Sequence, residues 1–400
     1  MTRSLLCIRF DSVVLRLPFS GYFDLQSASL TNHEAAELLL PGLNPTGAAP
    51  NSVVFSSLLT DSLPDLWGRK VVDALERARA RKKEVNPAPI DDASLLTAVC
   101  DTDRMGALRF ANKNDPQHYL GERRFAPPQA GDLVELNATA QRIESGDPVS
   151  ASVLERFAEN AAALGGSRPK VGFLDEKGRL CLAKLPSQAD DRDKGAWEFV
   201  VNTLAKNAGI RVSPFRLIDI GDVRGRVFAA RRFDRTDDGQ RLHYLSLRAL
   251  LGAEDNREVR SYQDLINLIE RICPDAQRQK EELWRRTVFK CLIHDGDDHL
   301  RNQGFLFEPQ GWTLSPAFDL NASRSQNRFT LFCDQQRLAL SPQALLPHFE
   351  TWGLDRSTAL DIYEEVRNVV VGWQEVAACA GIAEGEIEAM RSVFSAASQT

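Results

Sequence analysis

Near the start of the chain, a short apolar run lies within residues 1–10, and hydrophobic and polar residues alternate in the segment 12–17. We expect the apolar run to form a first strand. The alternation predicts a second, because successive side chains of a strand point to opposite faces. Farther on, apolar residues recur at helical spacing, which predicts a helix over residues 67–81. Asp61 or Ser62 is expected to cap this helix, because a short polar side chain can accept a hydrogen bond from a free backbone N–H.

The middle of the chain first loses this regularity and then regains it. Residues 112–150 hold several Pro and Gly turn signals, so we expect a connection there with a single strand at 132–136. A helix is predicted over residues 153–164. A hairpin follows, with strands at 171–174 and 179–185.

The pattern becomes mainly helical toward the carboxyl terminus. A helix is predicted over residues 196–208, and Gly209 lies just beyond its end. Its apolar face comprises Trp197, Val200, Val201 and Leu204. The other predicted elements are strands at 215–220 and 226–233, helices at 283–293, 359–376 and 382–397, and a strand pair between 303 and 315. We divide the chain into residues 1–111, a connection at 112–150, an α/β part at 151–238 and a mainly helical part at 239–400.

Composition limits the function classes. The 400 residues suffice for two or three domains, and 43% hydrophobic with 26% charged residues is typical of globular proteins. Without an apolar run of about 18 residues, we expect no membrane span. Seven cysteines scattered singly favour the reducing cytoplasm. A net charge of -6 argues against a large DNA-binding face, despite a basic run at 77–83.

The first candidate site is the sequence His294-Asp295-Gly296-Asp297-Asp298-His299-Leu300-Arg301-Asn302, which follows a predicted helix. Asp297 and Asn302 are separated by four residues, as are the base and the metal-binding amide in kinase catalytic loops. Asp and Asn are also common turn residues, so the spacing alone does not establish a kinase.

A second candidate follows the predicted strand pair, at Ser315-Pro316-Ala317-Phe318-Asp319. Kinases place a second metal-binding aspartate after such a hairpin, and a carboxylate suits the hard Mg²⁺ ion. The alternative role for Asp319 is to cap a turn.

The third candidate lies upstream, at Gly165-Gly166-Ser167-Arg168-Pro169-Lys170. Glycines let backbone N–H groups approach phosphates closely. Lys184 on the next predicted hairpin could bind phosphate, with Glu198 on the following helix as its partner. The alternatives are that Lys184 reaches solvent at a strand end and that Glu198 is an ordinary surface residue. The order of these candidates along the chain is that of a kinase.

A metal-dependent phosphohydrolase would also use a cluster of His and Asp residues. That site requires further histidines, and His33, His118, His243 and His348 do not form a helical pair with another ligand type. We expect His294 and His299 to order their loop by hydrogen bonding to the backbone.

Over nearly its whole length the chain resembles the HipA family of toxin kinases. The amino-terminal motifs are Asp61-Ser62-Leu63-Pro64-Asp65-Leu66-Trp67-Gly68-Arg69 and Arg104-Met105-Gly106-Ala107-Leu108-Arg109-Phe110. The others are residues 165–170, Arg232-Phe233-Asp234-Arg235, residues 296–302 and residues 315–320. The resemblance implies an α+β, bilobal protein-kinase-like fold, akin to phosphoinositide kinases. In it, residues 1–111 form an amino-terminal α/β subdomain, 151–238 the small lobe and 239–400 the helical large lobe.

The resemblance also implies ATP and Mg²⁺ as cofactors and transfer to a serine or threonine of a protein. It makes Asp297 the catalytic base, Asn302 and Asp319 the metal ligands, and His299 a support of the loop. The implied ATP-binding residues are Gly165, Gly166, Ser167, Arg168, Lys170, Lys184, Glu198, Arg231 and Phe233, with the adenine hinge near residues 231–233.

Members of this family act as toxins, phosphorylate aminoacyl-tRNA synthetases and arrest growth. The resemblance therefore implies a small helix-turn-helix antitoxin, HipB-like, through which DNA is mainly contacted. The active-site motifs leave open a small-molecule or lipid kinase, and a non-catalytic kinase-fold regulator is a further alternative.

Two positions depart from the family pattern. Many members carry, before the paired glycines, a serine whose autophosphorylation switches the kinase off, but this chain has Ala163 in that stretch. Ser167 is the hydroxyl residue that could substitute. Arg231 stands where relatives often have an acidic residue, a change that backbone contacts to adenine would tolerate.

Overall fold

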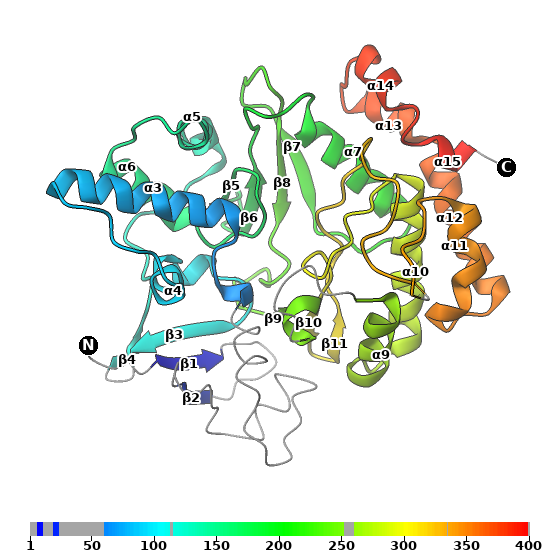
Figure 1. Ribbon diagram of the computed structural model, residues 1–400, viewed down its shortest axis with the longest axis horizontal. Coiled ribbons are helices and arrows are strands. Elements are labelled where there is room, and N and C mark those ends of the chain that lie inside the picture. The colour runs from blue at the N-terminus through cyan, green and yellow to red at the C-terminus, as the bar shows by residue number, and fades with distance from the viewer. Residues whose placement is uncertain are drawn as a thin grey trace.

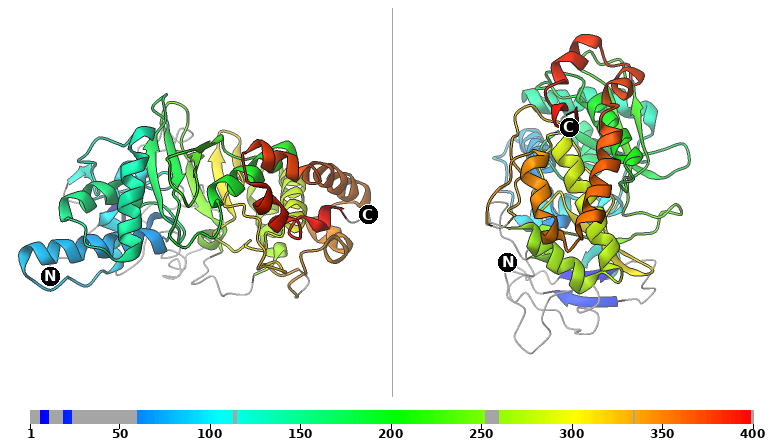
Figure 2. Two further views of the ribbon diagram at one scale, coloured as in Figure 1. Left: turned by 90° about the horizontal axis from the view of Figure 1, so that it is seen from above. Right: turned by 90° about the vertical axis from the view of Figure 1, so that its right-hand side faces the viewer.

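In this computed structural model, the described part of the chain contains three antiparallel sheets (Figure 1). The structure describes residues 6–10, 19–23, 60–112, 115–251, 260–333 and 335–398. Within those ranges, none of the helices combines the length and the hydrophobicity that crossing a bilayer would need. Figure 2 shows strands in the middle of the molecule, between the helices that follow the amino terminus and those that precede the carboxyl terminus.

The first sheet has the strand order β2-β1-β3-β4. Its strands are β1 (Leu6–Phe10), β2 (Phe19–Phe23), β3 (Leu108–Asn112) and β4 (Asp115–Tyr119). The first strand, predicted within residues 1–10, is confirmed by β1. The strand predicted at 12–17 lies outside the described residues.

The first long helix confirms the prediction for residues 67–81 but not its cap. Helix α3 spans Leu66–Lys83, and its N-cap residue is Asp65. The expected caps Asp61 and Ser62 instead lie in a short 3-10 turn, η1 (Thr60–Ser62), because the chain makes one more turn before the helix begins. Helix α4 (Asp92–Ala98) and the 3-10 turn η2 (Asp101–Asp103) follow.

The connection predicted at 112–150 contains a helix, so the strand predicted at 132–136 is wrong. After the 3-10 turn η3 (Ala130–Asp132), helix α5 spans Leu133–Ser145 and ends at Gly146, which has a positive φ of 76°. Residues three and four positions apart share its buried face. These are Leu133, Asn137, Ala140 and Ile143. Helix α6 (Ala151–Ala161) follows, with Ser150 as its cap.

The second sheet confirms the predicted hairpin and the two strands after it. Its order is β5-β6-β8-β7. The strands are β5 (Lys170–Leu174), β6 (Leu180–Lys184), β7 (Phe215–Ile218) and β8 (Val227–Arg231). Helix α7 (Lys194–Asn207) confirms the predicted helix, and all four residues of its predicted apolar face are buried.

The third sheet, β11-β10-β9, lies in the mainly helical half. It comprises β9 (His243–Ser246), β10 (Gly304–Glu308) and β11 (Gly311–Leu314), which confirms the predicted strand pair. The helices around it are α8 (Leu247–Leu250), α9 (Tyr262–Ile272), α10 (Ala276–Leu292), α11 (Pro342–Leu345), η4 (Leu346–Trp352), α12 (Arg356–Val370), α13 (Trp373–Cys379), α14 (Glu384–Met390) and α15 (Ser395–Ser398). The helices predicted at 359–376 and 382–397 are each divided in two.

Two large hydrophobic cores hold these layers together. One joins α3, α5 and α6 to the second sheet, and it includes Trp67 and Phe173. The other joins α7 to α9, α10, α12 and the last helices. There Trp197 of α7 has its ring centroid 6.2 Å from that of Trp373, which in turn stacks on Phe394 at 4.3 Å. The carboxy-terminal helices therefore support α7, the helix that carries Glu198.

Candidate functional site

One cavity of about 380 Å³ gathers nearly all the predicted site residues. It lies between the second sheet with α7 and the loops of the mainly helical half. The predicted residues that line it are Gly165, Gly166, Ser167, Lys170, Lys184, Glu198, Arg231, Phe233, Asp297, His299, Asn302 and Asp319. Hence residues from opposite halves of the chain meet in one place, as a shared active site requires.

Lys184 is the electrostatic centre of the cavity. Its Nζ lies 2.5 Å from Oε1 of Glu198 and 2.6 Å from Oδ1 of Asp319. The side chains of Lys184 and Glu198 are only 10% and 6% exposed, whereas that of Asp319 is 37% exposed. Lys184 thus joins a buried carboxylate on α7 to a more accessible one on the opposite wall.

This geometry shifts the pKa values of the cluster. Burial alone would lower the pKa of the Lys184 ammonium, but the carboxylates of Asp319 and Glu198 outweigh it and raise that pKa above its ordinary value. The Lys184 ammonium in turn lowers the pKa of the Asp319 carboxyl. Both groups are therefore charged at neutral pH.

The acidic loop, residues 294–302, is held from below by two buried aspartates. The carboxylate of Asp298 is fully buried and accepts hydrogen bonds from the Tyr262 hydroxyl and from the backbone N–H of Thr330, the latter at 2.7 Å. Asp295 is equally buried and accepts from the backbone N–H groups of Asp297 and Asn321. These contacts fix the path of the loop.

The glycine between these aspartates fits where no side chain could. A Cβ on Gly296 would lie 2.2 Å from the backbone oxygen of Arg328, so the neighbouring chain would have to move. The carbonyl oxygen of Gly296 accepts from the backbone N–H of Thr330 at 3.1 Å. The loop is therefore closely packed against residues 328–331.

Asp297 lines the cavity. Its carboxylate is 47% exposed, and Oδ1 lies 3.6 Å from Nε2 of His299. Asn302 donates from Nδ2 to the backbone oxygen of Asp297 at 2.7 Å. This hydrogen bond uses the amide nitrogen of Asn302 and not its amide oxygen. His299 accepts from the backbone N–H of Arg301 through Nδ1, as predicted for a histidine that orders the loop.

The backbone at Asp319 is unusual. Its φ is 54°, in the left-handed region that non-glycine residues seldom adopt. Asn321 donates from Nδ2 to Oδ1 of Asp319 at 3.1 Å, and its backbone N–H binds Asp295. Asn321 thereby links Asp319 to Asp295 of the acidic loop.

The chemistry of Asn302 and Asp319 suits a magnesium ion. Mg²⁺ prefers oxygen ligands, and these two side chains supply an amide oxygen and a carboxylate at one wall of the cavity. Among the residues that the structure describes, no group of three or more His, Cys, Asp or Glu side chains forms a metal cluster. A site of two protein ligands completed by phosphate and water is the kind that Mg²⁺ occupies in phosphoryl-transfer enzymes.

The Gly-rich loop, residues 165–170, covers one end of the cavity. Gly166 has a φ of 91°, a conformation open to glycine. The Nζ of Lys170 donates to the backbone oxygen of Gly165 beneath the loop. Burial, reinforced by the neighbouring Lys184 ammonium, lowers the pKa of Lys170 to about 8.

The opposite end of the cavity is aromatic. The ring of Phe233 lies 5.5 Å from the rings of both Tyr244 and Phe318, measured between centroids. Arg231, also at this end, forms an ion pair with Asp237. An aromatic wall beside the end of strand β8 is suited to a purine ring.

Arg168 is the predicted nucleotide-binding residue that does not line the cavity. Its guanidinium forms two bonds to Asp190, at 2.5 and 2.7 Å. Asp190 is almost fully buried and is held by the backbone N–H of Ser187. This bidentate pair turns Arg168 away from the cavity, a contact between residues 22 positions apart that the sequence did not indicate.

Three charged residues of the cavity wall were not predicted from the sequence. Asp61 was assigned to helix capping, and no role was given to Asp65 or Arg301, yet all three line the cavity. Asp61 accepts hydrogen bonds from the backbone N–H and the hydroxyl of Ser246, both at 2.7 Å. Their position inside two family-like motifs was the available signal.

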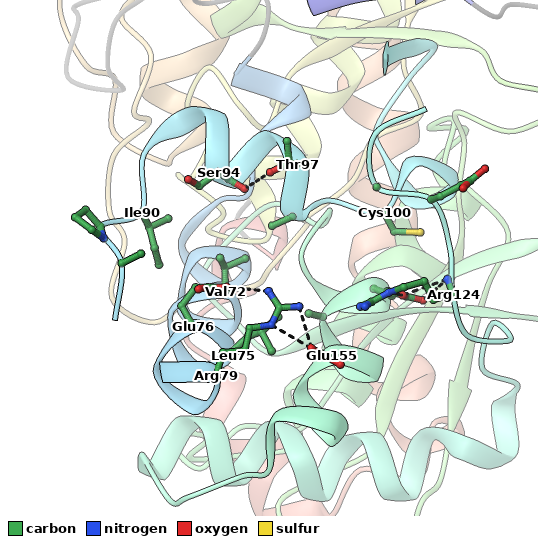
Figure 3. A pocket seen from close by; sticks show the side chains of 17 residues that line it. Val72, Leu75, Glu76, Arg79, Ile90, Ser94, Thr97, Cys100, Arg124 and Glu155 are labelled. Carbon is green, nitrogen blue, oxygen red and sulfur yellow. Dashed lines mark hydrogen bonds and ion pairs between the residues drawn. The ribbon is translucent and has the colours of Figure 1, made fainter. Parts of the chain in front are cut away.

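A second pocket, of about 430 Å³, lies among α3, α4 and α6, away from these residues (Figure 3). Two arginines in its lining are each paired with glutamates of the same lining. Arg79 binds Glu76 at 2.9 Å and Glu155 at 3.0 Å, and Arg124 binds Glu159 at 3.0 Å. We therefore place the functional site in the first cavity.

The chain is similar to several known proteins. A family model described as the HipA-like C-terminal domain matches residues 162–373. A curated protein of Sinorhizobium fredii, "Putative kinase Y4dM", is 30% identical over 151 residues. That alignment covers 35% of this chain, and the chain matches only 36% of the length of the relative.

A solved structure resembles the chain over nearly its whole length. It is the complex of Shewanella oneidensis HipA with HipB and operator DNA. Its HipA-like chain matches with a TM-score of 0.69 and 17% sequence identity, covering 98% of this chain and 96% of that one. The likeness shows a shared α+β, kinase-like fold.

Proposed function

This chain belongs to the family defined by the HipA-like C-terminal domain, and on that basis we propose that it is an ATP- and Mg²⁺-dependent serine/threonine protein kinase. It acts as the toxin of a toxin–antitoxin pair in the cytoplasm. The observation that carries the proposal is the meeting of Lys184, Glu198 and Asp319 with Asp297 and Asn302 in one cavity. We keep the lobe boundaries at 151–238 and 239–400 as part of this proposal.

The residues divide the work of phosphoryl transfer. Lys184, oriented by Glu198, binds the phosphates of ATP, while the amides of the Gly-rich loop cover them. Asn302 and Asp319 hold Mg²⁺, which would neutralise the charge that develops on the phosphates. Phe233 and the neighbouring rings hold the adenine.

Asp297 faces the acceptor. Its carboxylate is within the cavity yet half exposed, so a serine or threonine hydroxyl can approach and donate its proton to it. The hydroxyl oxygen then forms a bond to the γ-phosphorus as the bond to the leaving ADP oxygen breaks. His299, 3.6 Å from Asp297, orders this part of the loop.

The partner is a HipB-like helix-turn-helix antitoxin, and DNA is contacted mainly through it. Support comes from the structural relative, which was solved with HipB and operator DNA. The net charge of -6 also favours indirect DNA contact. The substrate is a translation component such as an aminoacyl-tRNA synthetase, whose loss of activity would arrest growth.

The test is phosphate transfer by the purified full-length chain. We expect label from γ-labelled ATP to enter protein in the presence of Mg²⁺ and to be lost when Mg²⁺ is chelated. Asp297→Ala should abolish transfer while leaving the folded state intact by circular dichroism. Asp361→Ala, on the exposed face of α12, is the matched control and should retain full transfer.

Phosphopeptide mass spectrometry then identifies the acceptor. Cells expressing the wild type should contain phosphoserine or phosphothreonine peptides that are absent from cells expressing Asp297→Ala. Undiminished transfer by Asp297→Ala would disprove the assignment of the base. Label confined to a lipid or a small molecule would replace the protein substrate with one of those classes.

A further inference from the structure

Asp65 lies at the amino terminus of α3 but does not cap that helix. Its backbone is extended, with φ of -89°, as an N-cap residue requires, yet its side chain accepts no capping hydrogen bond. Aspartate at this position ordinarily accepts from the second or third N–H group of its own helix. The carboxylate is therefore used elsewhere.

Both carboxylate oxygens of Asp65 reach loops of the cavity. Oδ2 accepts from the backbone N–H of Gly166 at 2.8 Å, and Oδ1 lies 2.5 Å from Nη1 of Arg301. Gly166 belongs to the Gly-rich loop, and Arg301 to the acidic loop, next to Asn302. One side chain from the amino-terminal part thus connects the Gly-rich loop to the acidic loop.

The residues after Asp65 hold the Gly-rich loop from the same side. The backbone N–H of Trp67 donates to the backbone oxygen of Gly166 at 2.9 Å, and its indole Nε1 donates to that of Lys170 at 3.0 Å. Gly68 packs so closely that a Cβ there would lie 2.4 Å from the backbone oxygen of Ala162. The start of α3 is therefore a support for the whole loop.

The segment before Asp65 is anchored to the other side of the cavity. Asp61 binds Ser246 through two hydrogen bonds of 2.7 Å. Ser246 pairs with Gly304 in the third sheet, at the first strand after the acidic loop. Residues 60–68 consequently span from the large half of the molecule to the Gly-rich loop, with Asp65 at the midpoint.

We propose that Asp65 is a positioning residue that couples the Gly-rich loop to the acidic loop, so that closure over ATP depends on the amino-terminal part of the chain. The proposal rests on the proposed kinase function. Asp65 contacts both loops but supplies no reacting group. Its ion pair with Arg301 fixes the end of the loop that holds Asn302, and its bond to Gly166 fixes the loop that covers the phosphates.

The test separates coupling from simple loss of stability. Hydrogen exchange is measured by mass spectrometry on peptides covering 163–170 and 296–304, in the wild type, Asp65→Asn, Arg301→Gln and the double variant. Asp65→Asn keeps the shape but removes the charge. Asp92→Asn, on the surface of α4 where Asp92 pairs with Arg69, is the matched control.

We expect Asp65→Asn to raise exchange in both peptides about tenfold, because a charge-assisted bond contributes about 1.4 kcal/mol or more. Arg301→Gln should raise exchange in 163–170 as well, since its effect passes through Asp65. Hydrogen exchange in the double variant should increase no more than in the single variant with the larger increase. Asp92→Asn should leave both peptides as in the wild type.

Kinetics supply a second readout. If the wild type transfers phosphate, Asp65→Asn should raise the KM for ATP about tenfold and lower kcat less, as expected when a loop that covers the nucleotide is loosened. Unchanged exchange in 163–170 for Arg301→Gln, or additive changes in the double variant, would overturn the coupling. An inactive wild type would reject the kinase function, whereas the exchange result would still decide the coupling.

Discussion

The Nζ of Lys184 lies 2.6 Å from Oδ1 of Asp319, although the two residues are 135 positions apart in the chain. The same Nζ lies 2.5 Å from Glu198, so two carboxylates share one cation. In the proposed reaction, Asp319 must bind Mg²⁺ and Lys184 must bind phosphate. One ion-paired cluster therefore positions both the proposed metal ligand, Asp319, and the proposed phosphate-binding residue, Lys184, before ATP binds.

Replacing Lys184 with methionine should destabilise the fold. The change leaves Glu198 and Asp319 without their shared cation, and breaking a buried ion pair costs about 3–5 kcal/mol. Because Asp319 is more than a third exposed, we expect the lower end, about 3 kcal/mol at pH 7. Urea denaturation would measure this loss, and Lys184→Arg should show a smaller one.

The stability lost in Lys184→Met should be smaller at acidic pH than at pH 7. Lys184 lowers the pKa of Asp319 in the folded state, so this stabilisation is present above the ordinary pKa of aspartate and fades as pH falls through the lowered value. The difference in the free energy of unfolding between wild type and Lys184→Met should accordingly become smaller below about pH 4. Equal stability of the two proteins at pH 7 would contradict the ion-pair account.

Lys170 should make ATP binding sensitive to alkaline pH. Its pKa is lowered to about 8, so the ammonium that attracts phosphate is present below that pH and lost above it. We expect the KM for ATP to rise between about pH 8 and pH 9. Lys170→Arg keeps its charge over this range and should show a flat profile; a parallel rise in that variant would place the titration elsewhere.

Expression without a partner should slow bacterial growth, and Asp319→Ala should relieve it. The substitution removes the proposed metal ligand at the wall of the cavity, so the phosphates of ATP would lack their counter-ion. Growth curves after induction would measure the effect, with Asp361→Ala as the variant that remains toxic. Equal toxicity of wild type and Asp319→Ala at matched protein levels would argue against a kinase-based toxin.

Trp373→Ala should reduce both stability and activity. Trp373 is 4% exposed and stacks on Phe394, so its removal leaves a cavity that costs about 3–5 kcal/mol. It also removes the neighbour of Trp197 on α7, which positions Glu198 beside Lys184. The melting temperature measured by calorimetry and kcat should both fall. Trp373→Phe, which keeps a ring, should lower both by less. An unchanged kcat in Trp373→Ala would show that these helices do not support the site.

The sequence predicted those parts of the structure that have a local signal. The spacing of Asp297 and Asn302 within one loop, and the apolar face of the helix that bears Glu198, can be recognised in short stretches. The strand prediction at 132–136 failed because that window is too short to show the helical spacing from Leu133 to Ile143, which extends over about three turns.

Contacts between distant segments had no such signal. Asp65 meets Gly166 across 101 positions, and nothing in either motif indicates the other as a partner. The same holds for Arg168, whose pairing with Asp190 depends on the path of the chain between them. Residue types and their order predicted most of the side chains that line the cavity, whereas the contacts that hold its loops together depend on the packing of distant segments.

The packing of α3 against the Gly-rich loop bears on how a shorter active protein could be made. The family match runs from 162 to 373, but a polypeptide cut at those positions would lose Trp67 and Phe157 from the core that contains Phe173, and would keep Trp373 without Phe394. Apolar surface from both hydrophobic cores would then face water, and such fragments aggregate. The smallest self-sufficient enzyme should therefore begin before residue 60 and extend through residue 398.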